Sequence, residues 1–317
     1  MNYLLIIFVI LVYCIINYYI KVRKNIETFE NKYEFLNSVS AFRVLGNQPY
    51  FDHFNKYDYK LRKCNKENVM NVYKNYIHNF TTEEIDAIRW LLDMLIPKMR
   101  DCIKNFPYDI WRFIKVSKLE GNMPHTRNDC IVLPAWFIKK IVKYKKNNNI
   151  EKAIKDTGLT LIHEQAHVYQ KLNKSIFNRL YKKYWNFENP SKIINLHLLK
   201  NNRTNPDGLD IKWLYKTHDN TYLMPIAIYN NYAFGITDVK YVFIEIIRKN
   251  DDFYYTRRYI RMSRNDEYNI FFGTDNNYHP NETSALYFTE YFKECHKLGN
   301  VSNTQAYEQF KIWLSEL

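Results

Sequence analysis

The stretch TLIHEQAHVYQ, residues 160–170, places two histidines four positions apart, with a glutamate directly after the first. In a helix His163 and His167 lie one turn apart on one face, so both imidazoles can reach the same ion. Zinc suits neutral histidine nitrogens and tolerates an open position for water. Glu164 would reach that water and act as a general base. The motif predicts zinc ligands His163 and His167 and a catalytic Glu164; two ordinary histidines on a buried helix are the alternative.

The residues around this motif predict a helix. Apolar side chains recur at helical spacing on two sides of the segment, as they do in a buried helix. Asp156 or Thr157 could cap the N-terminus, and the helix is expected to begin near Gly158. The two apolar stripes consist of Leu159, Ile162, Ala166 and Tyr169 or Gln170 on one side and Leu161, Val168 and Leu172 on the other.

A third ligand is predicted from a second helix, HPNETSALYFTEYF, residues 279–292. Pro280 and Asn281 are helix-start signals, which put Glu282 in the first turn. Ala285 follows on the same face and is small enough for this helix to approach the first one closely. Glu282 is therefore the predicted third ligand. A glutamate that only complements the helix dipole is the alternative; the rival ligands are His279, Glu290 and Glu294.

His163-Glu164-x-x-His167, with Glu282-x-x-Ala285 on a later helix, resembles the gluzincin group of zinc metallopeptidases. The resemblance implies a zincin-like α+β domain with an active-site helix, and one Zn²⁺ per chain held by His163, His167 and Glu282. It also implies peptide hydrolysis with Glu164 as general base, and a strand within residues 125–134 that binds the substrate backbone by strand addition.

Two features depart from the gluzincin pattern. From His167 to Glu282 there are 115 positions (282 − 167), which requires an insertion between the two helices. Leu286 stands where some members carry an aspartate that supports the zinc ligands. The donor for the developing oxyanion is left open among four side chains between the ligands: Tyr215, His218, Tyr222 and Tyr278.

The N-terminus predicts a membrane anchor. Residues 3–20 carry no charge, and as a helix they would span about 27 Å, enough to cross a bilayer core. No small-x-small cleavage site follows, which favours an anchor over a signal peptide. Lys21, Arg23 and Lys24 follow the run and no side-chain charge precedes it. The positive-inside rule therefore predicts a single-pass membrane protein whose catalytic domain faces the cytoplasm.

The rest of the chain is expected to be α+β. A helix is predicted from residue 82, with a capping box of Thr81 and Glu84 and an end or bend at Pro97. Strands are predicted within residues 108–118 and 128–138, and further helices within 175–187 and from Ser302. The domains follow as a transmembrane anchor (1–20), a helical N-terminal region (21–110) and a zincin-like domain (111–317) with a β-rich insertion (201–272).

Composition limits the partners. The net charge is +13, but the lysines and arginines are scattered, which favours a solvated surface over a nucleic-acid face. The five cysteines form no regular framework, which fits a reducing compartment. We expect a peptide or protein substrate, a membrane and no specific nucleic acid as partners; nothing indicates the oligomeric state. The alternative functions are an inactive, membrane-tethered zinc-binding scaffold and a basic nucleic-acid binder.

Overall fold

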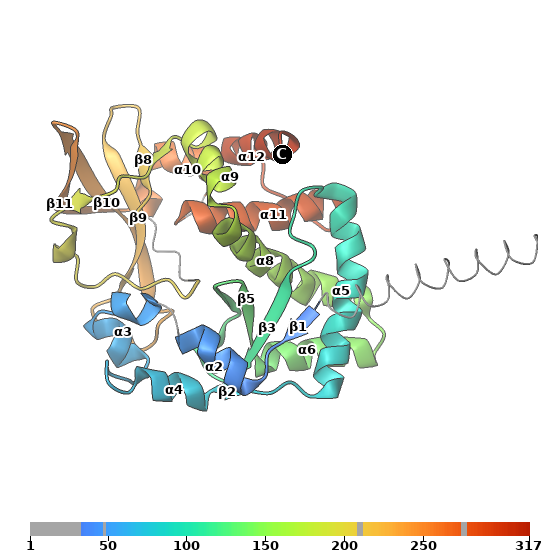
Figure 1. Cartoon of the computed structure of the whole chain (residues 1–317). Coiled ribbons are helices and arrows are strands. Elements are labelled where there is room, and N and C mark those ends of the chain that lie inside the picture. The colour runs from blue at the N-terminus through green and yellow to red at the C-terminus, as the bar shows by residue number, and fades with distance from the viewer. Residues whose placement is uncertain (1–32, 47–48, 208–211, 274–277) are drawn as a thin grey trace, which may run out of the picture.

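The computed structural model of the chain describes residues 33–46, 49–207, 212–273 and 278–317. Within them the chain is α+β, with two separate sheets and helices packed around the first (Figure 1). The helices are α2 (Ser38–Gly46), α3 (Lys56–Leu61), α4 (Val69–Asn75), α5 (Thr82–Cys102), α6 (Ala135–Lys146), α7 (Ile150–Ala153), α8 (Leu159–Leu172), α9 (Lys174–Arg179), α10 (Asp266–Phe272), α11 (Pro280–His296) and α12 (Gln305–Ser315).

The first sheet has the strand order β1-β3-β5-β4, and β2 pairs with β3 beside β1. Both β1 and β5 run parallel to β3, whereas β4 runs antiparallel to β5 and forms an edge of the sheet. The strand predicted within residues 128–138 is β5. It ends at Pro134, directly before α6, and lies between β3 and β4 inside the sheet. The strands are β1 (Tyr33–Phe35), β2 (Ile77–His78), β3 (Trp111–Val116), β4 (His125–Arg127) and β5 (Cys130–Pro134).

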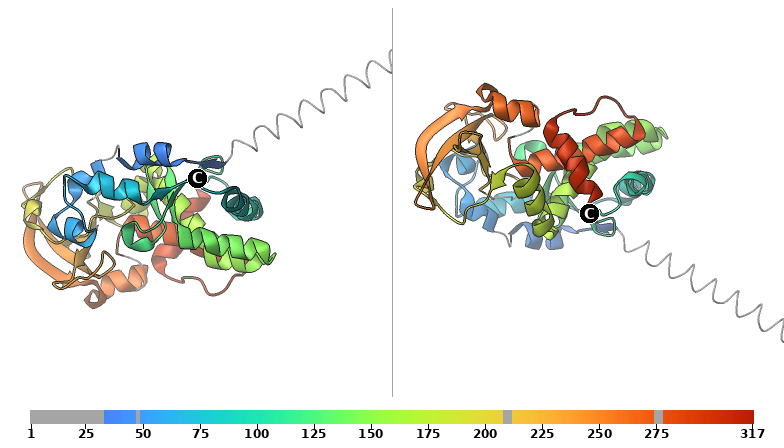
Figure 2. Two further views of the ribbon diagram at one scale, coloured as in Figure 1. Left: turned by 90° about the horizontal axis from the view of Figure 1, so that it is seen from below. Right: turned by 90° about the horizontal axis from the view of Figure 1, so that it is seen from above.

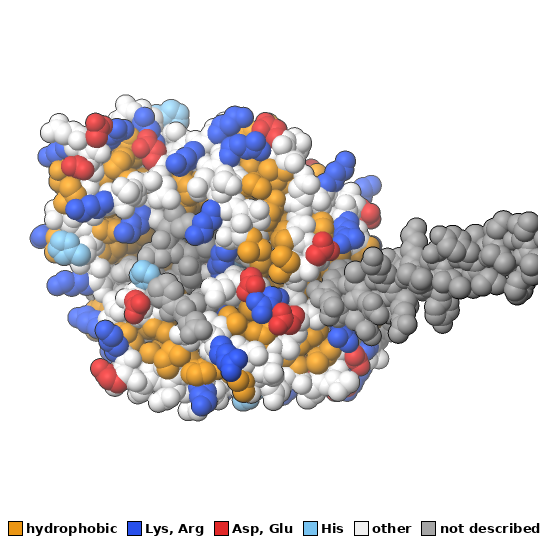
Figure 3. All heavy atoms as spheres, in the orientation of Figure 1, with side chains coloured by type: hydrophobic (Ala, Val, Ile, Leu, Met, Phe, Trp, Pro, Cys, Tyr) orange, Lys and Arg blue, Asp and Glu red, His pale blue; other side chains and the backbone are white. Residues whose placement is uncertain are grey.

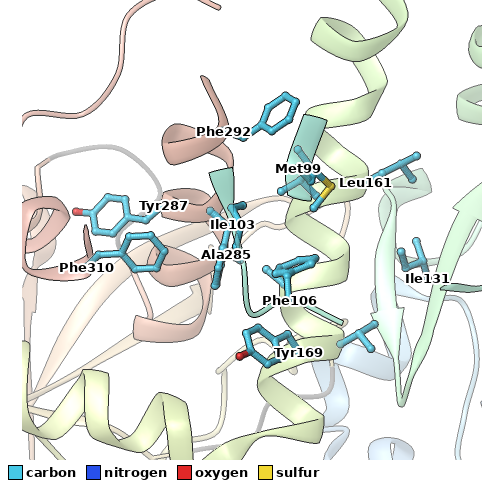
Figure 4. Packing of buried hydrophobic residues seen from close by; sticks show 14 of the residues in the cluster. Met99, Ile103, Phe106, Ile131, Leu161, Tyr169, Ala285, Tyr287, Phe292 and Phe310 are labelled. Atoms are coloured by element: carbon cyan, nitrogen blue, oxygen red, sulfur yellow. The ribbon is translucent and has the colours of Figure 1, made fainter. Parts of the chain in front are cut away.

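Successive side chains of β3 and β5 point to opposite faces of this sheet, and both faces are buried. One face meets the larger hydrophobic core, which α5, α6, α8, α11 and α12 complete and of which Figure 4 shows a part. The other face packs against α2 and α4. The larger core receives Trp111, Phe113, Ile131 and Leu133, and the smaller one Ile114, Val116, Cys130 and Val132.

The second sheet has the order β6-β8-β9-β10-β11-β7 and lies to one side of the helices (Figure 2). Most of it falls in the predicted β-rich segment, residues 201–272. Residues 266–272 of that segment form α10 instead, and β6 and β7 precede it. The strands are β6 (Phe187–Glu188), β7 (Ile193–Ile194), β8 (Leu214–Lys216), β9 (Tyr222–Tyr229), β10 (Val239–Lys249) and β11 (Asp252–Arg261).

The motif helix α8 begins at Leu159, next to Gly158 as predicted, but without the predicted cap. A π-helical turn (Ile154–Gly158) joins α7 directly to α8, so Asp156 and Thr157 do not cap a new helix. The hydroxyl of Thr157 donates to the carbonyl of Ala153 at 2.6 Å. Gly158 has helical backbone angles, and α5 packs close to it: a Cβ there would lie 3.4 Å from Cδ1 of Leu95.

Other predicted helix boundaries fare differently. The capping box of Thr81 and Glu84 is present, but Pro97 does not end α5, which continues to Cys102. The helix predicted within residues 175–187 continues from α9 into a π-helical turn (Leu180–Tyr184) and then gives way to β6. The last helix is capped by Thr304 rather than Ser302, because the Thr304 hydroxyl accepts the N–H of Tyr307 at 3.3 Å.

The expectation of a transmembrane helix in this fold needs correction. None of the helices in the described part of the chain is both long and apolar enough to cross a membrane. The predicted anchor, residues 1–20, lies outside the described residues. For the described residues, the structure therefore supports an α+β fold.

The charge of the surface agrees with the scattered basic residues in the sequence. On the face in Figure 3, Lys and Arg side chains are spread across the surface, with acidic side chains among them. The division into domains at residue 110 stays a prediction.

Candidate metal centre

Two turns of α8 carry the histidines of the motif. His163 and His167 lie on the same face, with ring centroids 4.7 Å apart, and their Nε2 atoms are 3.1 Å from each other. His167 is fully buried, whereas a quarter of the His163 side chain is exposed. Both rings therefore present the same nitrogen to one point, which solvent reaches on the His163 side.

The start of α11 brings Glu282 to that point. His279 caps this helix through its ring, and Pro280 occupies the first turn, so Glu282 lies in the first turn as predicted. Its Oε2 is 3.5 Å from Nε2 of His163 and 3.5 Å from Nε2 of His167. Ala285 is fully buried in the core shared by α8 and α11. The structure therefore brings together the three residues predicted as ligands.

The rival ligands are engaged elsewhere. His279 accepts the backbone N–H of Asn281 through Nδ1. Glu290 pairs with Lys293 at 2.9 Å, and Glu294 accepts the hydroxyl of Tyr307 at 2.6 Å. Within the described residues, His163, His167 and Glu282 form the one group of this kind that could hold a metal ion.

The separations of the three donor atoms fit a shared ion better than mutual hydrogen bonds. Three donors at about 2.0–2.1 Å from a tetrahedral zinc lie about 3.3–3.4 Å from one another, close to the 3.1, 3.5 and 3.5 Å found here. Charge-assisted hydrogen bonds are shorter, at about 2.7–2.9 Å. Two neutral nitrogens and one carboxylate oxygen are also a donor set that zinc prefers.

Without an ion, the centre holds a proton strongly. Burial favours the neutral ring of His167, but the negative charges of Glu282 and Asp207 outweigh it and raise its pKa to about 10. Burial likewise opposes the charge on Glu282, yet the neighbouring imidazoles hold the pKa of that carboxyl well below its usual range. Glu282 is therefore ionised, as a carboxylate ligand of a metal must be.

Glu164 follows His163 on α8, and its side chain is buried. Its Oε2 accepts the hydroxyl of Thr126 at 2.8 Å, and that hydroxyl also lies 3.1 Å from the Glu164 carbonyl oxygen. Burial, together with the nearby carboxylate of Asp207, raises the pKa of Glu164 to about 7. A carboxyl that exchanges its proton near neutral pH is suited to general acid–base chemistry.

The strand expected to bind substrate is β4, and its outer edge is already engaged. The N–H of Thr126 donates to Oδ1 of Asp207 at 2.8 Å, and the ammonium of Lys171 donates to the Thr126 carbonyl at 3.1 Å. Side chains of this same chain thus occupy the backbone groups to which a peptide strand would bind. Burial lowers the pKa of Lys171 to about 7.

A further contact reaches the predicted ligand Glu282: the side chain of Asn205 donates to its Oε1 at 3.1 Å.

Among the four candidate oxyanion donors, three are bound within or beside the second sheet. Tyr215 and His218 contact Glu267, and Tyr222 donates to Glu188. Tyr278 accepts a hydrogen bond from Arg203 at 3.2 Å. Burial and the charge of Glu282 raise the pKa of Tyr278 well above its usual value, so its phenol stays neutral.

Sequence reasoning missed three polar residues of this site: Thr126, Gln170 and Asp207. A signal existed for Gln170, since it follows His167 by three positions on the same helical face. Its Oε1 lies 2.9 Å from Nδ1 of His167. Thr126 and Asp207 lie far from the motif in sequence, and no local pattern points to them.

Comparison with protein-family models, curated proteins and solved structures gives no match.

Proposed function

We propose that this chain is a zinc-dependent metallopeptidase of the gluzincin type. The observation that carries the proposal is the triangle of donor atoms on His163, His167 and Glu282, whose sides of 3.1, 3.5 and 3.5 Å suit a single zinc ion. Glu164, between the two histidines in sequence, supplies a carboxyl whose pKa of about 7 suits a general base.

In the proposed reaction His163, His167 and Glu282 would hold the metal. Bound there, zinc would polarise the scissile carbonyl and lower the pKa of a water molecule. Glu164 would take the proton of the attacking water and deliver it to the leaving amine. The hydroxyl of Thr126 would keep the Glu164 carboxyl in place through its 2.8 Å hydrogen bond.

A peptide is the proposed substrate because an edge strand adjoins Glu164. Peptides bind such edges through main-chain hydrogen bonds, and β4 pairs with β5 on one side only. Tyr278 is the proposed oxyanion donor, since burial and the nearby charge of Glu282 keep its hydroxyl neutral beside the donor atoms of the site.

One observation favours a second candidate, a zinc-binding scaffold without turnover. Asp207 and Lys171 occupy both outward backbone groups of Thr126, as they would in a protein that admits no substrate strand. On this alternative the metal would tie α8 to α11 and no peptide would be cleaved.

The test uses the whole chain, purified and supplied with zinc. We expect about one zinc per chain. We also expect cleavage of a mixed peptide library, measured as the appearance of new amino termini. Glu164→Gln should keep the zinc and slow cleavage by about 10²–10⁴-fold.

The other outcomes are distinct. Zinc in the parent with no cleavage of any peptide would favour the scaffold. A folded parent that binds no zinc would contradict both candidates.

A further inference from the structure

We propose that Gln170 is the positioning residue of this metal centre, because one amide holds both the ring of His167 and the turn that carries Glu282. The inference rests on the proposed function, since it concerns how the zinc ligands are held. Gln170 is buried, with 4% of its surface exposed, and three polar groups surround its amide.

The orientation of the amide follows from one of its partners. The nitrogen end lies 2.7 Å from the carbonyl oxygen of Asn281, which can only accept a hydrogen bond. The NH₂ group of Gln170 must therefore face Asn281, and Oε1 must face His167. The chemistry of the neighbours, rather than the assignment of two similar atoms, decides the direction.

The oxygen end of the Gln170 amide determines which ring nitrogen of His167 carries the proton. Oε1 accepts only, so Nδ1 of His167, 2.9 Å away, must carry a proton and donate it. When the ring is neutral, its lone pair is then on Nε2, the atom that faces His163 and Glu282. A ligand that donates its other nitrogen in this way keeps its orientation and becomes more basic toward a metal.

The nitrogen end holds the first turn of α11. Besides the carbonyl of Asn281, it donates to the hydroxyl of Ser284 at 2.8 Å. These two residues flank Glu282 in the sequence. The Ser284 hydroxyl in turn donates to the Asn281 carbonyl at 3.1 Å and lies 2.8 Å from the hydroxyl of Tyr181. The turn is thus tied to α8 by a buried network of hydrogen bonds.

Packing alone would not give this result. Contact between α8 and α11 sets the distance between the helices, but apolar contacts permit small rotations and shifts along their axes. A hydrogen-bonded amide does not, because its two ends have fixed directions. Gln170 therefore relates the direction of one ligand to the position of another, which lies 115 positions away (282 − 167).

The closing experiment measures zinc affinity by competition with a chelator, together with thermal unfolding of the metal-free chain. Gln170→Met preserves side-chain volume and removes both ends of the amide. We expect its zinc affinity to fall by about 10–100-fold, the usual cost of losing a group that supports a ligand. Ser284→Ala removes one partner of the amide and should cost less, about 2–10-fold.

Gln165→Met is the matched control. Gln165 lies on the same helix, is equally buried, and also donates twice, to the carbonyls of Pro107 and Ile110 at 3.0 and 2.7 Å. It should lower the unfolding temperature of the metal-free chain about as much as Gln170→Met. Its zinc affinity should stay within about threefold of the parent.

The outcomes separate this inference from the proposed function. If the parent binds zinc and both Gln170→Met and Ser284→Ala bind it as tightly, the positioning role is refuted and the metal centre stands. If the two Met variants lose affinity equally, Gln170 acts only through stability and the inference fails. A parent without zinc would overturn the proposed function and this inference together.

Discussion

The backbone N–H of Thr126 on the edge strand β4 donates to Oδ1 of Asp207 at 2.8 Å, which leaves that edge unavailable to a peptide. A substrate strand that pairs with β4 must first displace this carboxylate. Asp207→Ala should therefore lower the KM for peptides by about 2–10-fold, the equivalent of one net hydrogen bond.

Asp207→Asn provides the control for charge. It removes the same negative charge but keeps an oxygen that can accept the Thr126 N–H, so its KM should stay near that of the parent. Steady-state kinetics on one peptide would decide. Equal KM values for the two variants would show that Asp207 does not compete with substrate.

Glu282 and Glu290 lie two turns apart on α11, and in the described part of the chain only Glu282 belongs to the group that could hold a metal ion. Glu282→Gln should weaken zinc binding by more than about 100-fold, beyond the cost of losing a supporting partner. Glu290→Gln, which loses only its contacts with Lys293 and the Ser302 N–H, should bind zinc like the parent. Metal analysis after dialysis against a weak chelator would measure both. Equal zinc loss in the two variants would contradict the assignment of Glu282.

Zinc binding should release a proton from His167. The pKa of this ring is raised to about 10 because, against the effect of burial, Glu282 and Asp207 stabilise its charged form. A zinc ligand must be neutral, so the proton has to leave. Between pH 7 and 9 zinc affinity should rise by about tenfold per pH unit. Calorimetry in buffers of different ionisation enthalpy would measure the number of protons released. No proton release at pH 8 would contradict the raised pKa of His167.

The same raised pKa has the opposite effect on the metal-free chain. A folded pKa of about 10 against an ordinary value of 6.5 contributes stability that is complete below pH 6.5. That stability is lost as the pH rises through 10. Unfolding in urea should therefore become easier over this range without zinc, and the loss should be much smaller in Glu282→Gln.

Glu120 should govern resistance to acid. Burial opposes its charge, but the guanidinium groups of Arg62 and Arg127, at 2.7 and 3.1 Å, lower its pKa to about 2. The resulting stability is present above pH 4.5 and is lost as the pH falls toward 2, at a cost of about 3 kcal/mol.

Urea unfolding at pH 7, 4 and 3 would measure that loss. Glu120→Gln should flatten the pH dependence and destabilise the chain at pH 7, because it removes the carboxylate that pairs with the buried Arg127, while Arg62 keeps its ion pair with Asp58 at 2.8 Å. Glu83→Gln, at an exposed ion pair with Lys146, should change neither. An unchanged acid profile in Glu120→Gln would contradict the prediction.

Local signals in the sequence predicted the elements that carry the metal group. The spacing of His163 and His167 required a helix, and Pro280 with Asn281 marked the start of α11. Both inferences depend on neighbours within one or two turns. They succeed because side-chain spacing and helix-start preferences act over that same range.

The surroundings of the group could not be predicted in this way. Thr126 meets Glu164 across 38 positions, and the N–H of Thr126 meets Asp207 across 81. Such contacts depend on how β4 packs against α8, which no local pattern encodes. The cap expected at Asp156 or Thr157 failed for a related reason. The helix continues through Gly158, which packs against Leu95 of α5, a tertiary contact that the local sequence does not reveal.

The positions of α8 and α11 in the sequence also determine when each part of the candidate metal group is synthesised. The chain leaves α8, forms the whole second sheet, and only then returns as α11. A ribosome that adds about 5–20 residues per second needs about 6–23 s to pass from His167 to Glu282. During that interval the two histidines have been synthesised and Glu282 has not. The complete centre can therefore form only after the second sheet has been synthesised.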